Sequence, residues 1–251
     1  MLTDPAEERT GNGLLDSLAK RRRSEFVHAC ELVELRVGQS LCKPNETIRH
    51  VYFPRSGYIS LIAPAGGRES LEVGLTGREG GFGLTVLLDI DKSSIFGVVQ
   101  GDGTALRIAV AELRRRVEDN AQLRTVLNRY LFVLMAQIAQ TALCSRFHRL
   151  DARLARWLLM AHDRMQGDVF PLTHLFLGYI LGARRAGVTT VASRLKNDGL
   201  INYRRGVIRI LDRKGLEALS CRCYRAGNEL YSTHLSVRQN SPARAAQRVA
   251  T

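Results

Sequence analysis

The sequence predicts an α+β protein with a β-rich N-terminal half, a long central helix and a C-terminal helix-turn-helix that leads into a hairpin. Three features of the 251 residues support this prediction. Short alternating runs separated by turn residues fill the first half. Residues 113–165 contain neither proline nor glycine, and residues 181–201 carry paired arginines between two glycines. The chain is long enough for one large domain or two modest ones.

The N-terminal half contains four segments with strand character. "LVELRVGQSL" (32–41) alternates apolar and polar residues, which predicts a pair of half-buried strands. "IRHVYFPRSGYISLI" gives two further strands interrupted by the turn residues 54–57. "SLEVGLTGREGGFGL" adds a strand and the glycine-rich loop 77–83, and "IFGVVQGDGTALRIAV" adds two strands around the turn 101–103. Short strands with regular turns predict a sandwich or barrel-like domain.

The central segment has the spacing of a long helix with one apolar stripe. Apolar or small residues recur at intervals of four and three, as in the a and d positions of a coiled coil. These positions are Leu127, Leu131, Leu134, Ile138 and Thr141. The spacing is equally compatible with packing against the chain's own domain and with a seam between two copies. We take the stripe as a candidate dimer seam.

The C-terminal third reads as helix, tight turn and helix. In "LTHLFLGYILGARRAGVTTVASRLKNDGLI", apolar residues recur at helical spacing on both sides of Gly182, and Gly199 suits a helix C-cap. The second helix would expose cations and short hydroxyls: Arg184, Arg185, Thr189, Thr190, Ser193 and Arg194. Short hydroxyls fit the major groove, and arginine reaches guanine edges or phosphates. The following "LINYRRGVIRILD" predicts a basic hairpin through Arg204 and Arg205, which completes a winged helix.

Positive charge is concentrated in the same region. The chain has a net charge of +13, and residues 172–215 contain nine Lys/Arg against two Asp, a net +7. This local excess indicates a polyanionic partner. Residues 236–251 are rich in Arg, Ala and Ser and predict a disordered basic tail. Without a membrane-length apolar run or a secretory signal, we expect a cytoplasmic protein with no membrane partner.

Neither the cysteines nor the histidines predict a metal or catalytic site. The odd count of five cysteines disfavours a disulfide framework, and Cys221-x-Cys223 has no matching second pair. His162-Asp163 resembles the pair of a metal-dependent phosphohydrolase, but His148, Asp151 and His174 are poorly spaced for one metal. The alternative is that His162 and Asp163 connect the helix end to the winged helix. We therefore predict no metal ligands, no catalytic residues and no enzyme.

From about Gly13 to Tyr224 the chain resembles the Crp/Fnr family of bacterial transcription regulators. The resemblance is carried by "HVYFPRSGYISLI", "GREGGFGL", "RLARWLLMAHDRM", "LTHLFLGYILGARRAGVT" and "DGLINYRRGVIRILDRKGLE". It implies a double-stranded β-helix (a jelly-roll, cyclic-nucleotide-binding-like domain) at 13–115. It also implies a dimerisation helix at 116–147 and a winged helix-turn-helix at 148–220.

The resemblance assigns roles to residues of the winged helix. The recognition helix falls on 184–196, and Arg185 occupies the position of the family's base-reading arginine. Ala186 stands where many members have a glutamate, and Thr190 where another arginine often lies. These departures imply a different half-site sequence. Thr173 and His174 match positions that usually contact phosphates.

The effector pocket departs further from the family. The loop 77–84 resembles the family's glycine-glutamate loop, with Gly77, Glu79 and Gly80 as pocket residues. The position of the phosphate-binding arginine falls in a segment that offers only Lys92, Ser93 and Ser94. Because no arginine fork is present there, we expect no tight binding of a cyclic nucleotide.

We expect no cofactor in the sensor domain. Cys30 and Cys42 are too isolated to hold an iron–sulfur cluster. Haem is the alternative that stays open, with His28, His50 and Cys42 as candidate ligands.

The sequence thus predicts a sequence-specific DNA-binding transcription regulator. It would act as a homodimer on an inverted-repeat operator, with a degenerate or altered effector pocket. The expected partners are double-stranded DNA and a second copy of the chain. RNA polymerase is a candidate partner for which the sequence shows no surface. The alternatives are a ligand-sensing module with only nonspecific DNA binding and a metal-dependent phosphohydrolase.

Overall fold

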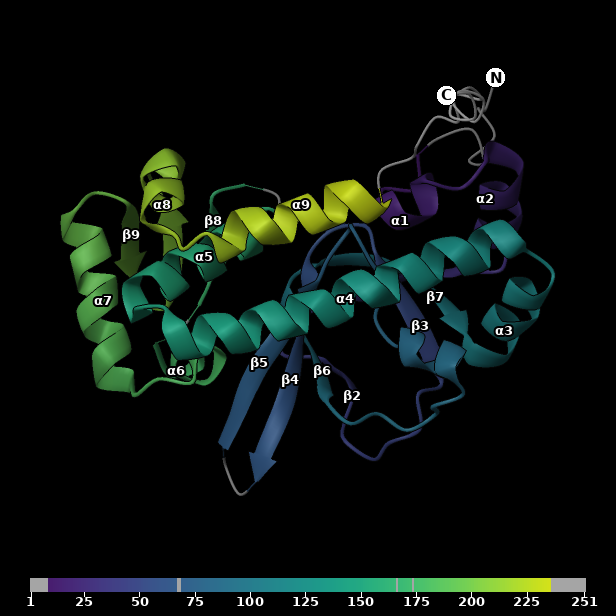
Figure 1. The fold of residues 1–251 in the computed structure, drawn as a ribbon, viewed down its shortest axis with the longest axis horizontal. Coiled ribbons are helices and arrows are strands. Elements are labelled where there is room, and N and C mark those ends of the chain that lie inside the picture. Colours follow the sequence, from purple (N-terminus) through teal and green to yellow (C-terminus); the bar gives the residue numbers. More distant parts are fainter. Residues whose placement is uncertain (1–8, 67–68, 166, 173, 236–251) are drawn as a thin grey trace, which may run out of the picture.

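The long helix α4 (Ala121–Phe147) organises the molecule. A computed structural model describes residues 9–66, 69–165, 167–172 and 174–235. Figure 1 shows the β strands of the first half on one side of α4 and helices α6 and α7 at one end of it. The α+β class predicted from the sequence is confirmed. Thr173 and the predicted tail 236–251 lie outside the described residues.

The N-terminal domain is a roll of two antiparallel sheets. Within the described residues, one sheet has the order β1-β7-β3 and the other β2-β6-β4-β5. The strands are β1 (Glu31–Leu35), β2 (Ser40–Cys42), β3 (His50–Pro54), β4 (Tyr58–Gly66), β5 (Glu69–Thr76), β6 (Phe96–Gly101) and β7 (Gly103–Ala109). Helices α1 (Gly13–Asp16) and α2 (Lys20–Val27) precede the roll, and the 3-10 helix η1 (Leu84–Leu88) lies between β5 and β6.

Strands that follow each other in the chain often belong to different sheets. The predicted strand pair at 32–41 is wrong in this respect, since β1 pairs with β7 and β2 pairs with β6. The chain crosses between the sheets at Gly38, whose φ of 83° lies in the left-handed region that glycine adopts readily. Alternation predicts a strand but not its partner, so only the roll as a whole was predictable.

The core of the roll includes one face of α4. Val51, Phe53 and Ile59 lie in this core with residues of the long helix. Leu127 is 0% exposed and Leu131 is 8% exposed, both within the same apolar cluster. The predicted seam is therefore wrong at these two positions, because their side chains already pack inside their own chain. Leu134, Ile138 and Thr141 are half-buried.

The segment without proline or glycine forms three helices in place of one. α3 (Val110–Glu118), α4 and α5 (Leu150–His162) are separated by breaks at Asp119-Asn120 and His148-Arg149. Asn120 begins α4 as an N-cap, since its side-chain oxygen accepts a hydrogen bond of 3.1 Å from the Leu123 amide. Residues 116–118 thus belong to α3, whereas the sequence assigns them to the long helix.

The C-terminal domain is a winged helix-turn-helix, as predicted. α6 (His174–Leu181) and α7 (Arg185–Asn197) are joined through Gly182, whose φ is 53°. The sheet order is β8-β10-β9, and α8 follows it. The bounds are β8 (Val169–Pro171), β9 (Ile201–Arg204), β10 (Val207–Ile210) and α8 (Arg213–Leu219).

A last helix, α9 (Cys223–Leu235), has no counterpart in the sequence prediction. It runs back beside α4, so that the chain returns from the winged helix to the roll (Figure 1). Gln137 of α4 forms hydrogen bonds with both the roll and α9. Its Oε1 accepts a 2.7 Å hydrogen bond from the Leu75 amide of β5, and its Nε2 donates to the Tyr231 hydroxyl of α9 at 2.7 Å. None of the described helices is long and apolar enough to cross a membrane.

Candidate nucleic-acid interface and its junctions

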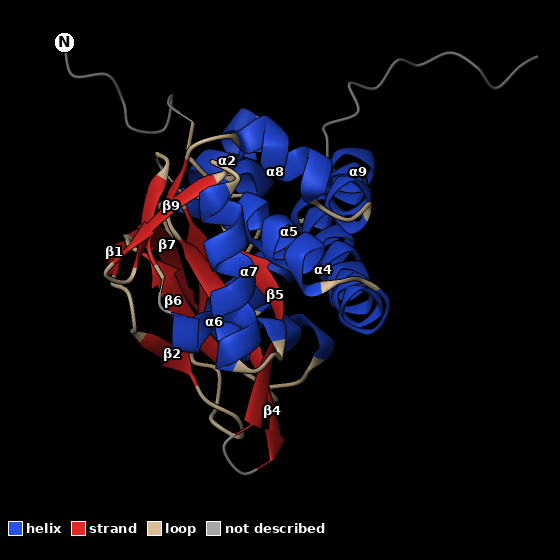
Figure 2. Cartoon of the chain, turned by 90° about the vertical axis from the view of Figure 1, so that its left-hand side faces the viewer, coloured by secondary structure: helices blue, strands red, loops and turns tan. Residues whose placement is uncertain are grey.

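Helix α7 lies at one end of the molecule with one face buried and the other exposed. Val188, Ala192 and Leu195 are buried, in the same apolar cluster as residues of α5 and α6. Arg185, at the first turn, is exposed. In Figure 2 the end of the molecule formed by α6 and α7 faces the viewer, in front of the strands and of α4. The α7 N-terminus combines free amide groups with a positive dipole end, which favours phosphate.

The predicted DNA-contacting residues fall into two groups. Arg184, Arg185, Ser193, Arg204 and Arg205 are exposed. In the second group, Thr189, Thr190 and Arg194 donate hydrogen bonds within the chain. Thr173 and His174 have no described side chain. Thr189 and Thr190 are exposed, and their hydroxyls donate to the carbonyls of Arg185 and Ala186 at 3.0 and 3.1 Å. The side chain of His174 is outside the described part of the structure.

Arg194 is an exception to the predicted interface. Its Nη2 donates to Asp151 Oδ2 at 2.6 Å, and this ion pair connects α7 to α5. The pKa of Asp151 is lowered although burial opposes this, because the Ala152 amide and the Arg194 guanidinium stabilise the carboxylate. The Arg194 side chain thus has a positioning role in the isolated chain.

The wing is a two-residue hairpin with arginine at its tip. Arg204 of β9 pairs with Val207 of β10, so Arg205 and Gly206 form the turn. Both have positive φ, 51° and 76°, as a type I′ turn requires. A left-handed conformation costs a residue other than glycine about 1–2 kcal/mol. The chain therefore accepts backbone strain to place an arginine at this tip.

The predicted effector residues form two separate sets. Glu79 Oε1 accepts the Gly77 amide at 3.0 Å and pairs with the buried guanidinium of Arg164, 2.7 Å from its Nη2. Gly80 lies directly under the Tyr130 ring, where a Cβ would come within 2.2 Å of ring atoms. This set faces the α4–α5 side of the roll.

The second set lies on another loop. The Ser93 hydroxyl donates to the Ile95 carbonyl at 2.7 Å, and the Ser93 backbone pairs with Asn45 and Glu46. Ser94 is exposed beside it. The two candidate haem ligands Cys42 and His50 line one surface pocket, whereas His28 lines a different pocket.

A buried glutamate connects the roll to helix α5 of the C-terminal domain. Glu72 of β5 accepts hydrogen bonds from the Ser60 hydroxyl at 2.5 Å and from the Trp157 indole of α5 at 2.6 Å. Burial raises the pKa of Glu72 to about 7, against the opposing effect of these hydrogen bonds. Glu72 has no distinguishing signal in the sequence, because an acidic residue in an alternating strand normally faces water.

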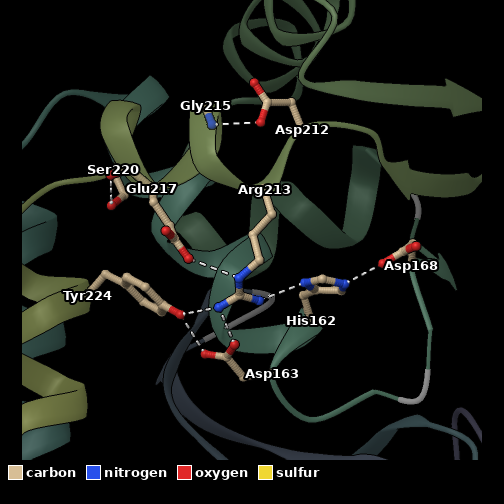
Figure 3. Close-up of polar contacts among 9 residues, drawn as sticks. All are labelled: His162, Asp163, Asp168, Asp212, Arg213, Gly215, Glu217, Ser220 and Tyr224. Carbon is tan, nitrogen blue, oxygen red and sulfur yellow. Dashed lines mark hydrogen bonds and ion pairs between the residues drawn. The ribbon is translucent and has the colours of Figure 1, made fainter.

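His162 and Asp163 connect the end of α5 to the winged helix, as the second interpretation of this pair predicted. Arg213 donates to His162 Nδ1 at 2.8 Å and to Asp163 Oδ1 at 2.7 Å (Figure 3). His162 Nε2 then donates to Asp168 at 2.8 Å, and the Tyr224 hydroxyl donates to Asp163 at 2.8 Å. Both residues are thereby committed to Arg213, and the geometry of the pair gives no support to the phosphohydrolase interpretation.

Four side chains of metal-ligand type converge where the end of α4 meets the start of α9. Cys144 and His148 at the end of α4 lie beside Cys221 and Cys223, and their ligand atoms are all within 4.8 Å of one another. The expectation that Cys221-x-Cys223 lacks a matching pair was wrong. The second pair is the Cys-x3-His at the α4–α5 break, 77 residues from Cys221 in sequence. Only the fold brings the two pairs together.

Comparisons with known proteins agree with this architecture. Residues 152–219 match the Crp-like helix-turn-helix domain. FixK2 from Bradyrhizobium japonicum is 16% identical and superposes with a TM-score of 0.64 over 76% of this chain and 98% of its own. The c-di-GMP responsive global regulator CLP from Xanthomonas campestris is 17% identical, with a TM-score of 0.62 over 77% of this chain and 100% of its own.

A third similar structure is TTHA1359, a transcriptional regulator of the CRP/FNR family from Thermus thermophilus. It is 22% identical, with a TM-score of 0.60 over 76% of this chain and 98% of its own. The search of curated proteins found no match. At these identities the likeness shows the fold.

Proposed function

The chain has the Crp/Fnr fold with a Crp-like helix-turn-helix domain, and we propose on this basis that it is a sequence-specific DNA-binding transcription regulator. The observation that carries the proposal is the exposed basic face of α7 beside the wing. Arg185 at the start of the recognition helix and Arg204 and Arg205 on the wing are exposed. In a winged helix these positions face a base edge and the flanking phosphates.

The test is binding selection on random duplex DNA with the full chain and no added ligand. We expect an enriched inverted repeat. Arg185→Ala should cost about 1–3 kcal/mol on the enriched site and relax the preference at one base position. Arg21→Ala, an exposed arginine of α2, is the matched control and should bind like the unmodified chain. Salt-sensitive binding to all sequences alike would refute sequence reading and leave only a phosphate-binding surface.

We further propose that two copies pair through an exposed stripe of α4. Phe132, Met135, Leu143 and Phe147 are 50%, 64%, 47% and 70% exposed, respectively. Together with Ala139 they recur at intervals of three and four, so they lie on one face of the helix. This stripe is offset from the buried one that contains Leu127. On an inverted repeat, the two recognition helices of such a dimer would have to lie roughly 34 Å apart, one turn of DNA.

Size measurement with one substitution tests the pairing. Met135→Glu should convert a dimer to a monomer without unfolding it, because Met135 is largely exposed in its own chain. Leu32→Glu is the control, since Leu32 is an equally exposed apolar residue on β1. A Met135→Glu chain that stays dimeric would show that the stripe is not the interface.

The effector site is proposed to be altered relative to the cyclic-nucleotide binders. Glu79, the expected ribose ligand, is engaged by Arg164. A ligand would have to compete with a buried ion pair before it reached this carboxylate. Calorimetric titration with cyclic AMP and cyclic GMP should give no binding at micromolar concentration, and a micromolar Kd would overturn this part of the proposal.

A further inference from the structure

The cysteine–histidine cluster lies at the hinge between the long helix and the DNA-binding domain. Cys144 is in the last turn of α4, and His148 follows that helix as its C-cap. Cys221 lies between α8 and α9, and Cys223 is the first residue of α9. Four ligand-type side chains thus come from two segments that flank the winged helix on both sides. The proposed regulator function does not use any of them.

The distances fit one tetrahedral ion. Cys144 Sγ lies 3.5 Å from Cys221 Sγ, and Cys223 Sγ lies 3.4 Å from His148 Nδ1. With metal–sulfur bonds near 2.3 Å, the edges of a tetrahedral zinc site are about 3.8 Å. We propose that Cys144, His148, Cys221 and Cys223 bind one zinc ion through three sulfurs and one imidazole nitrogen. The Cys3His set is one that structural zinc sites use.

Buried polar groups lie beside the sulfur atoms. The three cysteines are buried, and the Gln140 amide donates to Cys223 Sγ at 2.8 Å. Arg156 is buried and lines the same small cavity as Cys144, and its Nε has no hydrogen-bond partner in the described part of the chain. Three thiolates and one divalent ion leave a net charge of −1. The neighbouring guanidinium offsets that charge.

A single ion fits better than an iron–sulfur cluster. In a cluster the cysteines bind different iron atoms, so their sulfurs spread around a body larger than one ion. Here all four ligand atoms lie within 4.8 Å of one another. A buried, fully protein-ligated tetrahedral site leaves no position open for a substrate, which is the pattern of structural zinc and not of catalytic zinc.

Zinc in this site would fix the orientation of the winged helix relative to α4. The ion would join the two chain segments that flank the winged helix, the end of α4 and the start of α9, so that the α4–α5 break could not bend freely. This consequence for DNA rests on the proposed function, whereas metal binding itself does not. The two are therefore measured separately.

The experiment is metal analysis of the full chain, purified without chelators and under reducing conditions. We expect about one zinc ion per chain. A chromogenic chelator should release it reversibly. Reloading with Co²⁺ should give the visible absorption of tetrahedral thiolate coordination. Cys223→Ser should lose the zinc, whereas Cys30→Ser, whose thiol lies on the N-terminal side of the roll, should keep it.

A second variant keeps the test valid if Cys223→Ser does not fold. Gln140→Leu preserves all four ligands and removes only the hydrogen bond to sulfur, so zinc should bind about 10–100-fold more weakly. A folded, fully reduced chain without zinc that fails to take up Zn²⁺ or Co²⁺ would overturn the proposal. Iron with acid-labile sulfide, or a Cys144–Cys221 disulfide in protein purified with reductant, would do the same.

Failure of the zinc site and failure of the regulator function give different results. A chain that binds zinc and shows no DNA sequence preference overturns the function and leaves the site intact. A chain that reads DNA equally well with and without chelator, and contains no zinc, overturns the site alone. If both are correct, metal removal should weaken specific DNA binding at least tenfold, and zinc should restore it.

Discussion

The arginines of the winged-helix surface and those of the domain junction differ in exposure and in ion pairing. Arg185 and Arg205 are exposed, and in the described part of the chain no carboxylate pairs with either. Arg164 is buried against Glu79, and Arg213 contacts His162, Asp163 and Glu217. Local charge in the sequence therefore overstates the charge left unpaired on the winged-helix surface, because some of the arginines hold the domains together.

The comparison predicts that junction arginines affect stability and surface arginines affect binding. The largest effect is expected for Arg164→Ala. It leaves the Glu79 carboxylate partly buried without its partner, which typically costs about 3–5 kcal/mol of unfolding free energy. Denaturant unfolding measures this cost. Arg185→Ala is the matched surface variant and should lie within about 0.5 kcal/mol of the unmodified chain.

A result that contradicts the comparison is easily recognised. Equal unfolding free energies for the Arg164 and Arg185 variants would mean that the Glu79–Arg164 pair contributes nothing beyond its own desolvation. A double variant, Arg164→Ala with Glu79→Gln, separates the two cases. It should recover part of the lost stability, since the unpaired charge is then removed as well.

An intermediate effect is expected from Glu72, the buried carboxyl between the roll and Trp157. Its pKa is raised from 4.5 to about 7 in the folded chain, so the folded state keeps a proton that the unfolded state releases. The stabilising contribution is therefore complete below about pH 4.5 and is lost as the pH rises through 7. Glu72→Gln should stabilise the chain by about 1–3 kcal/mol at pH 8 and have little effect at pH 4.

Unfolding measured at both pH values tests this sign. Glu118→Gln, an exposed carboxylate of α3, is the control and should show no pH-dependent difference. If Glu72→Gln destabilised the chain equally at both pH values, Glu72 would serve as a charged ligand of Trp157 and not as a buried neutral acid.

The smallest effect is expected at the wing, where stability and binding should change in opposite directions. Arg205→Gly relieves the positive φ of 51° and should raise the unfolding free energy by up to about 1 kcal/mol. If the proposed DNA interface is correct, the same variant removes one phosphate contact. It should weaken all DNA sequences alike and lower the salt dependence of binding by about one phosphate. A loss of sequence preference would show that the wing reads bases.

Local signals in the sequence predicted the helix-turn-helix fold well. Gly182 and Gly199 mark the turn and the cap of the helix-turn-helix, and both have positive φ in the structure. The helical spacing of apolar residues also located the long helix. It did not show which neighbour covers each face, and this is why Leu127 lies in the roll while Met135 is exposed.

Long-range pairings were beyond the reach of the sequence. No local pattern brings Cys144 to Cys221, or Glu72 to Trp157, because these contacts exist only after the domains have packed. The apolar spacing of α9 around Leu230 and Tyr231 was a usable signal for a helix. Its return along α4 had none.

The position of α9 has a consequence for folding during synthesis. Tyr231 and Leu235 pack against the apolar cluster of the N-terminal roll, and Tyr231 shares Gln137 with β5. The roll is translated first, yet two of its packing partners are translated more than a hundred residues later. A nascent chain on the ribosome can therefore form the sheets early, but it can seal the first domain only after the whole winged helix has emerged.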